Sequence, residues 1–191
     1  NFYDVYQSDL SDERNPSNPK LVNKAINSKY HEGPLSLYDG DNKMIFTRSL
    51  QEKTAKGERL LGLFTAERDA KDKSWKNIQP FPFNNKEFSV FHPAISEDGD
   101  TLYFSSEMPG GYGGGDIYRS VKENGSWTKP ENMGSQVNTE GNELFPYLHN
   151  QVLYFSSDGH AGLGGLDIYQ VELYKNGALQ VENIGYPLNS S

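Results

Sequence analysis

The sequence predicts an all-β fold made of repeated four-stranded antiparallel units, and three observations lead to this prediction. A motif at residues 100–118 occurs again at residues 151–169, so that Leu102 and Leu153 are 51 residues apart. Each copy reads as a strand, a glycine-rich loop and a second strand. Aromatic residues, which favour strands, make up 13% of the chain, and no long stretch free of Gly and Pro has helical periodicity. A unit that recurs at this spacing indicates a repeat architecture.

Turn-forming residues divide each unit into four short strands. The first hairpin turn is Asp39-Gly-Asp-Asn42 in one unit, Glu97-Asp-Gly-Asp100 in the next and His149-Asn-Gln151 in the third. Asp, Asn and Gly tolerate the positive φ that such turns need. The second strand, Thr101-Leu-Tyr-Phe-Ser105, has a continuous apolar centre, as expected for a strand covered on both faces. Four strands in a unit of about 50 residues are typical of β-propeller blades.

The repeat predicts a single β-propeller region over residues 1–191. Residues 1–28 would form the outer half of a blade and a connector, and residues 29–88, 89–143 and 144–191 would form three complete blades. The strand resembling Asp116-Ile-Tyr118 and the connector that ends in Asn each occur four times, but the first hairpin occurs three times. A closed ring needs at least about four blades. We therefore expect the chain to be a fragment of a larger ring or protein.

Composition excludes several classes of function. The net charge is −8, which argues against a nucleic-acid-binding surface because such a surface needs clustered Lys and Arg. The chain contains no Cys, so disulfides, thiol catalysis and zinc sites with Cys ligands are excluded. No apolar run approaches the roughly 20 residues of a membrane-spanning helix, so we expect no transmembrane segment.

Two segments carry a resemblance to known families. The segment Ala94-Ile-Ser-Glu-Asp-Gly-Asp-Thr-Leu-Tyr-Phe-Ser-Ser106 resembles the TolB-type, WD-like propeller repeat. Its continuation, Pro109-Gly-Gly-Tyr-Gly-Gly-Gly-Asp-Ile-Tyr118, resembles a narrower subgroup, the PorE-like periplasmic OmpA-family proteins of gliding and type IX-secreting bacteria. That subgroup also carries segments similar to Trp127-Thr-Lys-Pro130 and Val137-Asn-Thr139. Residues 29–88 fit less well, because the charged segment Arg48–Arg59 replaces the glycine-rich loop.

The resemblance implies a role in the cell envelope. Proteins of this subgroup are scaffolds that link outer-membrane and secretion machinery to the cell wall, and they bind peptidoglycan through an OmpA-like domain that this chain does not contain. The resemblance therefore implies a periplasmic, outer-membrane-associated, peptidoglycan-associated protein whose propeller makes protein–protein interactions with envelope partners. It does not imply an enzyme.

The glycine-rich loops are the first candidate site. The cluster from Gly110 to Gly115 lacks the Lys-Ser/Thr sequence and the helix start of a phosphate-binding loop. Its sequence resembles a nonapeptide calcium repeat, but such repeats recur about every nine residues rather than every 51. The favoured interpretation is structural, with Asp116 and Asp167 accepting hydrogen bonds from turn amides. We predict no cofactor, and calcium stays the alternative.

No residue set indicates catalysis. Most of the acidic residues in turns fall in the same hairpin of successive blades, rather than facing each other as the carboxylates of a glycosidase do. These acidic residues are Asp39, Asp41, Glu97, Asp98, Asp100, Glu140 and Glu143. The four histidines, which are His31, His92, His149 and His160, have no metal-ligand spacing. The Ser105-Ser106 pair recurs with the fold and lacks a nucleophile elbow. We therefore expect no catalytic residues, no metal site and no enzymatic activity.

Two apolar loop residues are the candidate partner-binding residues. Tyr112 and Leu163 occupy corresponding positions in the two glycine-rich loops, where burial is difficult. Exposed aromatic or aliphatic loop tips are common contact points for protein partners. The leading hypothesis is thus a non-catalytic, protein-binding propeller. The alternatives are a propeller that binds or hydrolyses glycans or peptidoglycan fragments at its central mouth, and a propeller that gates a larger peptidase.

Overall fold

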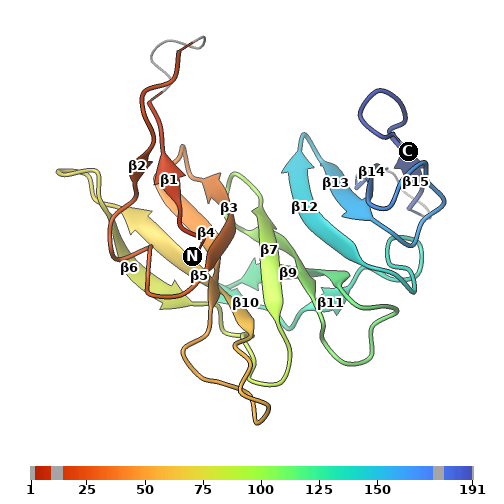
Figure 1. The fold of residues 1–191 in the computed structure, drawn as a ribbon, viewed down its shortest axis with the longest axis horizontal. Coiled ribbons are helices and arrows are strands. Elements are labelled where there is room, and N and C mark those ends of the chain that lie inside the picture. The colour runs from red at the N-terminus through yellow and green to blue at the C-terminus, as the bar shows by residue number, and fades with distance from the viewer. Residues whose placement is uncertain (1–2, 10–14, 174–178, 191) are drawn as a thin grey trace.

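The computed structural model describes residues 3–9, 15–173 and 179–190, and every helix or strand assigned in these ranges is a β-strand. The strands form a half-blade and three blades that follow one another along an arc (Figure 1). The half-blade is β1 (Tyr6–Gln7) paired with β2 (Lys20–Leu21). Blade 1 contains β3 (Glu32–Tyr38), β4 (Lys43–Ser49), β5 (Leu61–Arg68) and β6 (Trp75–Pro80) in that order.

The other two blades repeat this arrangement. Blade 2 contains β7 (Val90–Ile95), β8 (Thr101–Ser106) and β9 (Asp116–Glu123), and its outermost strand is split into β10 (Ser126–Trp127) and β11 (Glu131–Asn132). Blade 3 contains β12 (Glu143–His149), β13 (Val152–Ser157), β14 (Asp167–Glu172) and β15 (Val181–Asn183). All pairings are antiparallel, which confirms the predicted fold class.

The first strand of each blade is the innermost one, and each begins earlier than the sequence suggests. The sequence places the strand starts at Pro34, Pro93 and Pro146, whereas β3, β7 and β12 begin at Glu32, Val90 and Glu143. Each of these strands has a β-bulge at its proline, where the residues are not paired in the ladder. The proline lacks an N–H but removes no ladder hydrogen bond there, so the strand extends to residues before it. In β7 and β12 the bulge places His92 and Phe145 at φ values of 51° and 52°.

Three apolar clusters hold the arc together, one at each junction. One cluster joins the half-blade to blade 1, one joins blade 1 to blade 2 and one joins blade 2 to blade 3. Trp75, Trp127 and Leu179 occupy one repeat position, and each belongs to the cluster at the junction with the preceding blade. The sequence repeat is therefore also a repeat of the packing.

Four connector asparagines fasten each connector to the third strand of its own blade. The Asn138 side chain accepts a hydrogen bond from Ile117 N at 2.7 Å and donates one to Ile117 O at 3.0 Å. Asn84 and Asn189 make the same pair of bonds, to Leu63 and Ile168. Asn27 does so with Val5 in the half-blade. The four copies predicted from the sequence are thus structurally equivalent.

Candidate functional site: the axial pocket and the loop tips

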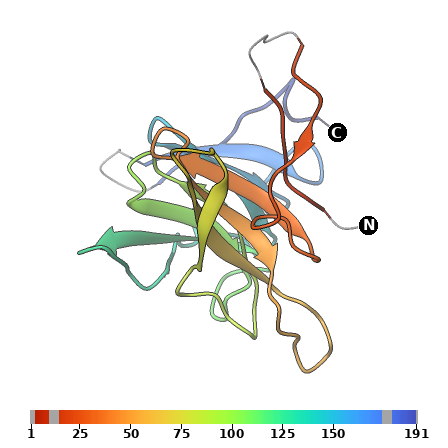
Figure 2. The same ribbon diagram turned by 90° about the vertical axis from the view of Figure 1, so that its left-hand side faces the viewer.

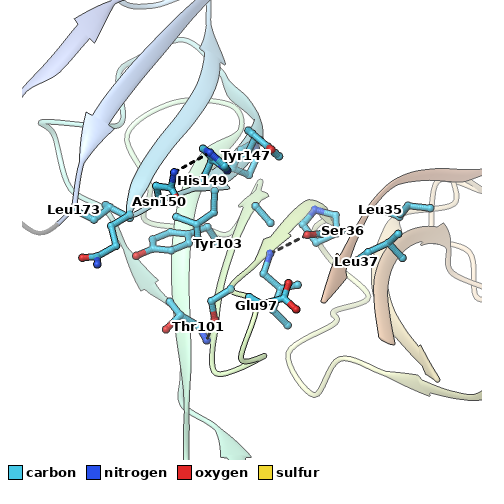
Figure 3. Close-up of a pocket in the computed structure, with 17 residues that line it drawn as sticks. Leu35, Ser36, Leu37, Glu97, Thr101, Tyr103, Tyr147, His149, Asn150 and Leu173 are labelled. Carbon is cyan, nitrogen blue, oxygen red and sulfur yellow. Dashed lines mark hydrogen bonds between the residues drawn. The ribbon is translucent and has the colours of Figure 1, made fainter. Parts of the chain in front are cut away.

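The innermost strands β3, β7 and β12 enclose a pocket of about 830 Å³ on the concave side of the arc (Figure 3). We call it the axial pocket. Its walls come from all three blades and from the hairpin turns after β7 and β12. The lining consists of Leu35, Ser36, Leu37, Pro93, Ala94, Ile95, Ser96, Glu97, Thr101, Tyr103, Pro146, Tyr147, Leu148, His149, Asn150, Gln151 and Leu173.

The pocket exists because each innermost strand has one unpaired edge. Such an edge presents backbone groups that invite pairing with another strand. Pro93 and Pro146 lie on these edges and line the pocket, and a proline has no N–H to leave unpaired. Ile95 N in β7 donates a hydrogen bond to Ser36 Oγ in β3 at 3.2 Å, which ties two innermost strands together. Strand residues therefore form most of the wall, and the hairpin turns after β7 and β12 complete it.

Aromatic and planar polar side chains gather at the mouth of the pocket. Tyr147 is 61% exposed, and its ring is nearly parallel to that of His149, with 6.3 Å between centroids and 5° between planes. Asn150 Nδ2 and His149 Nε2 are 2.9 Å apart. Leu37, which is 40% exposed, adds an apolar side chain from blade 1. The mouth thus offers an apolar platform with amide groups beside it.

The electrostatic character of the axial pocket is neutral to acidic. Within the described part of the chain, its lining includes the carboxylate of Glu97 but no Lys or Arg. Glu97 Oε1 accepts a hydrogen bond from Gly40 N at 2.7 Å, so this carboxylate also joins the hairpin turns of blades 1 and 2. Burial raises the pKa of Tyr103, while nearby Arg119 lowers it, and the net direction is upward. Tyr103 therefore presents a neutral hydroxyl at neutral pH.

The glycine-rich loops are held by their aspartates, as the structural interpretation predicts. Asp116 is 1% exposed and accepts hydrogen bonds from Tyr112 N at 2.6 Å and Gly113 N at 3.0 Å. Asp167 accepts the corresponding bonds from Leu163 N and from Gly164 N. Asn132 and Asn183 donate a further bond to Asp116 and Asp167. The carboxylates thus satisfy amides of the loop itself.

The two predicted partner-binding residues are solvent-exposed at the tips of these loops. Tyr112 is 50% exposed and Leu163 is 53% exposed. Neither residue lines the axial pocket. β12 starts at Glu143, whose N–H donates to Gly115 O in a glycine-rich loop, and ends at His149 beside the pocket. The tips therefore lie at the opposite ends of the strands from the pocket mouth, and they form a separate candidate surface.

The remaining predicted groups have structural partners. His92 stacks on Phe145 with 3.8 Å between ring centroids, and burial lowers the pKa of His92 to about 4. Ser105 Oγ donates to Glu143 O at 2.9 Å, and Ser157 Oγ donates to Glu143 Oε1 at 2.6 Å. Residues 3–9, 15–173 and 179–190 contain no group of three or more His, Asp and Glu side chains placed to hold a metal ion.

Sequence reasoning missed the residues at the pocket mouth. Tyr147 and His149 lie in the first strand of blade 3, two residues apart, and so point to the same side of the strand. The first strand of each blade lies innermost, next to the axial pocket. An aromatic and a polar residue two positions apart in that strand therefore predict side chains that face the pocket. The interpretation of His149 as a turn residue obscured this signal.

Comparison with known proteins supports the fold. No protein-family model matches the sequence, and no curated protein sequence matches it. Among solved structures, TolB from Acinetobacter baumannii is similar over 93% of this chain and 36% of its own, with 15% identity and a TM-score of 0.53. A puromycin-hydrolyzing peptidase from Mycobacterium tuberculosis is similar over 90% of this chain and 24% of its own, with 12% identity and a TM-score of 0.55.

These likenesses bear on the fold alone. The chain spans about a third of the length of TolB and about a quarter of the length of the peptidase. The described residues form no helix that is both long enough and apolar enough to cross a membrane.

The likeness to TolB and to the peptidase, together with the four-stranded antiparallel blades, shows that this chain has a TolB-like β-propeller fold.

Proposed function

We propose that this chain is a non-catalytic, protein-binding propeller region of a cell-envelope scaffold, which links outer-membrane and secretion machinery to the cell wall. The axial pocket is the observation that carries the protein-binding part of the proposal. Its volume of about 830 Å³ lies in the range of ligand-binding clefts. The periplasmic, outer-membrane-associated location and the OmpA-family context rest on the resemblance of residues 89–191 to the PorE-like subgroup.

The side chains at the pocket suit a polypeptide ligand. Tyr147 and Leu37 are exposed on opposite walls, and exposed aromatic and aliphatic groups in a concave site are typical anchors of protein interfaces. Ser36, Asn150 and Gln151 supply hydrogen-bonding groups beside these anchors. Most of the lining belongs to strands, whose fixed backbone keeps the entropy cost of binding low.

The recurrent serines support a non-catalytic role. Ser105 and Ser157 are fully buried, and their hydroxyls donate to Glu143. The Ser106 hydroxyl donates to Ser89 O at 2.8 Å. A nucleophilic serine needs an exposed oxygen and an adjacent base. These side chains instead join neighbouring strands and blades.

A capture experiment with envelope proteins tests the proposal. The immobilised chain is compared with a Leu37→Ala, Tyr147→Ala double variant and with Leu188→Ala, an exposed control outside the axial pocket. We expect the double variant to lose specific partners that the control retains. Equal recovery by all three proteins would refute the axial pocket as a partner-binding surface.

The loop tips provide a second contact surface in this proposal. Tyr112 and Leu163 are presented on loops that Asp116 and Asp167 hold in place, so their exposure is a fixed feature of the surface. A Tyr112→Ala, Leu163→Ala double variant is expected to lose partners in the same capture assay. Unchanged recovery of every partner would remove the tips from the proposal.

Glycan binding is the second candidate function, and the Tyr147–His149 pair favours it. An exposed aromatic ring beside planar amide groups suits the apolar face and the hydroxyls of a sugar. Calorimetric titration with glycans and muropeptides tests this candidate, together with an assay for their hydrolysis. Heat of binding that disappears in Tyr147→Ala would support it, and the absence of both heat and turnover would exclude it.

A propeller that gates a larger peptidase is a third candidate, and it differs from the others in its sequence context. The full-length precursor sequence distinguishes them. An α/β-hydrolase region in the precursor would favour the peptidase, whereas an OmpA-like region would favour the envelope scaffold.

A further inference from the structure

The loop between β4 and β5 differs from its counterparts in blades 2 and 3. It projects beyond the ends of the strands, as the orange segment at the bottom of Figures 1 and 2 shows. Residues 50–60 carry three cations, Lys53, Lys56 and Arg59, against two carboxylates, Glu52 and Glu58. The chain as a whole has a net charge of −8. The glycine-rich loop is therefore replaced by a local excess of positive charge.

A second pocket, of about 760 Å³, lies beside this loop, and we call it the cationic pocket. Its lining comes from the N-terminal segment, the connector before β3, the β4–β5 loop and the segment before β7. The lining residues are Tyr3, Tyr30, His31, Ser49, Lys53, Arg59, Leu61 and Ser89. Among the described residues, the lining contains no Asp or Glu. Donor groups thus surround a cavity on an otherwise acidic protein.

Arg59 is held in position by contacts that leave its charge uncompensated. Its guanidinium lies over the Tyr30 ring, 4.0 Å from the centroid. Its Nη1 donates to the backbone oxygens of Leu50 and Gln51. A guanidinium has more N–H donors than these contacts use. Carbonyl oxygens orient the group without neutralising it, so Arg59 is available to a carboxylate.

Lys53 is the second cation of the pocket. The ion pairs among the described residues involve Lys43, Lys76 and Lys86, and neither Lys53 nor Arg59 takes part in one. The nearby carboxylate of Glu52 pairs with Lys86 at 2.6 Å. Glu107 approaches the pocket wall but accepts a hydrogen bond from Ser89 N at 3.3 Å. Glu52 therefore pairs outside the pocket, and Glu107 contacts the backbone of the pocket wall rather than Lys53 or Arg59.

We infer that the cationic pocket binds an acidic segment of a partner polypeptide, with carboxylates at Lys53 and Arg59 and an apolar side chain against Tyr3 and Tyr30. This inference rests on the proposed protein-binding function and adds to it a third, chemically different site. Arg and Lys recognise carboxylates through charge-assisted hydrogen bonds. The tyrosine rings favour a ligand that carries apolar groups as well, which a free inorganic anion lacks.

A peptide titration tests the inference. The probe is a short fluorescein-labelled peptide of Asp and Phe residues, and the matched probe has Asn in place of every Asp. We expect the Asp peptide to bind and the Asn peptide to bind at least about tenfold more weakly, because the charge-assisted bonds are lost. Binding of the Asp peptide is expected to weaken as the salt concentration rises.

Matched variants locate the binding. Lys53→Ala and Lys53→Glu are expected to weaken binding of the Asp peptide progressively, while Lys129→Ala, at an exposed lysine of blade 2, leaves it unchanged. Arg59→Lys retains the charge and tests the oriented guanidinium. Lys53 is exposed, so its variants are expected to keep the melting temperature of the parent chain. Binding that is indifferent to Lys53 would overturn the inference.

Two further outcomes separate this inference from the proposed function. Polygalacturonate that binds with the same dependence on Lys53, while the Asp peptide does not bind, would assign an acidic glycan to the pocket and overturn the peptide inference. Loss of envelope partners in the Leu37→Ala, Tyr147→Ala variant depends on the axial pocket alone. That result would stand even if the Asp peptide fails to bind.

Discussion

Blades 2 and 3 contain nearly the same strand motif, yet they bury it to different extents. Tyr103, Ser105 and Ile117 of blade 2 are at most 4% exposed, because blade 3 covers this face of the sheet. Their counterparts Tyr154, Ser156 and Ile168 in blade 3 are half-buried. On the opposite face, which packs against the preceding blade, Phe104 and Phe155 are equally buried.

This comparison shows that the position of a blade in the arc decides how much its residues contribute to the stability of the fold. The strand Leu-Tyr-Phe-Ser-Ser has large side chains pointing to both faces, which suits a blade with neighbours on both sides. At the end of the described arc, one face of the same strand is only partly covered, so the same residue type stabilises the fold less. Four predictions test and sharpen this difference, from the largest expected effect to the smallest.

The covered faces of blades 2 and 3 are expected to be energetically equal. Phe104→Ala and Phe155→Ala should each lower the free energy of unfolding by about 3–5 kcal/mol, because each removes a fully buried ring and leaves a cavity. Urea denaturation of the two variants measures this. Losses that differ by more than about 2 kcal/mol would show that the two blades are not equivalent even on their covered faces.

The faces that differ in burial are expected to differ in energy. Ile117→Ala should cost about 2–4 kcal/mol, whereas Ile168→Ala should cost less than about 1.5 kcal/mol because its side chain already contacts solvent. The same denaturation experiment compares them. Equal losses would mean that another surface covers the face of blade 3 in solution.

The connector asparagines are expected to contribute alike in both blades. Asn138→Ala and Asn189→Ala should each cost about 1–3 kcal/mol, because each leaves a backbone N–H and a C=O of the third strand without partners. Thermal melting, with the exposed Asn18→Ala as a control, measures the effect. A loss of stability in Asn138→Ala alone would show that the Asn189 hydrogen bonds do not stabilise blade 3.

Stability is expected to fall in acid through His92 at the junction of blades 2 and 3. Burial lowers its pKa to about 4 from 6.5, so between these values the unfolded chain binds a proton that the folded chain does not. The stability due to neutral His92 is therefore present above pH 6.5 and is lost as the pH falls towards 4. His92→Asn, which tolerates positive φ, should flatten this pH dependence of the melting temperature. An unchanged slope would assign the acid sensitivity to other groups.

The sequence predicts most of the fold because the same strand and turn patterns recur along it. The strand–loop–strand motif, the two tryptophans and the connector asparagines recur at nearly constant spacing, and each recurring position has the same packing role in the structure. The two bulges at His92 and Phe145 could not be predicted, because the proline beside each of them is equally compatible with a simple strand start.

The candidate surfaces were harder to predict, for physical reasons. The exposure of Tyr112 and Leu163 follows from glycine-rich loops that offer no core, and the sequence predicts this exposure. The axial pocket combines side chains from three blades that are about 50 residues apart in the chain, so a local pattern such as the Tyr147 and His149 pair marks only one wall of it. The cationic pocket lies where Tyr3 and Tyr30 come close to the β4–β5 loop. This loop lacks the glycine-rich motif of its counterparts, so the repeat does not predict which residues lie beside it.

The connector asparagines also bear on how the number of blades in such a chain can change by gene duplication. Each one binds a residue 21 or 22 positions earlier, so the fastening is complete within one unit and needs nothing from the next. The chain entropy lost on closing such a short segment is the same for every copy. A tandem duplication of one unit therefore carries its own fastening with it, and the number of blades can change without any redesign of the blades already present.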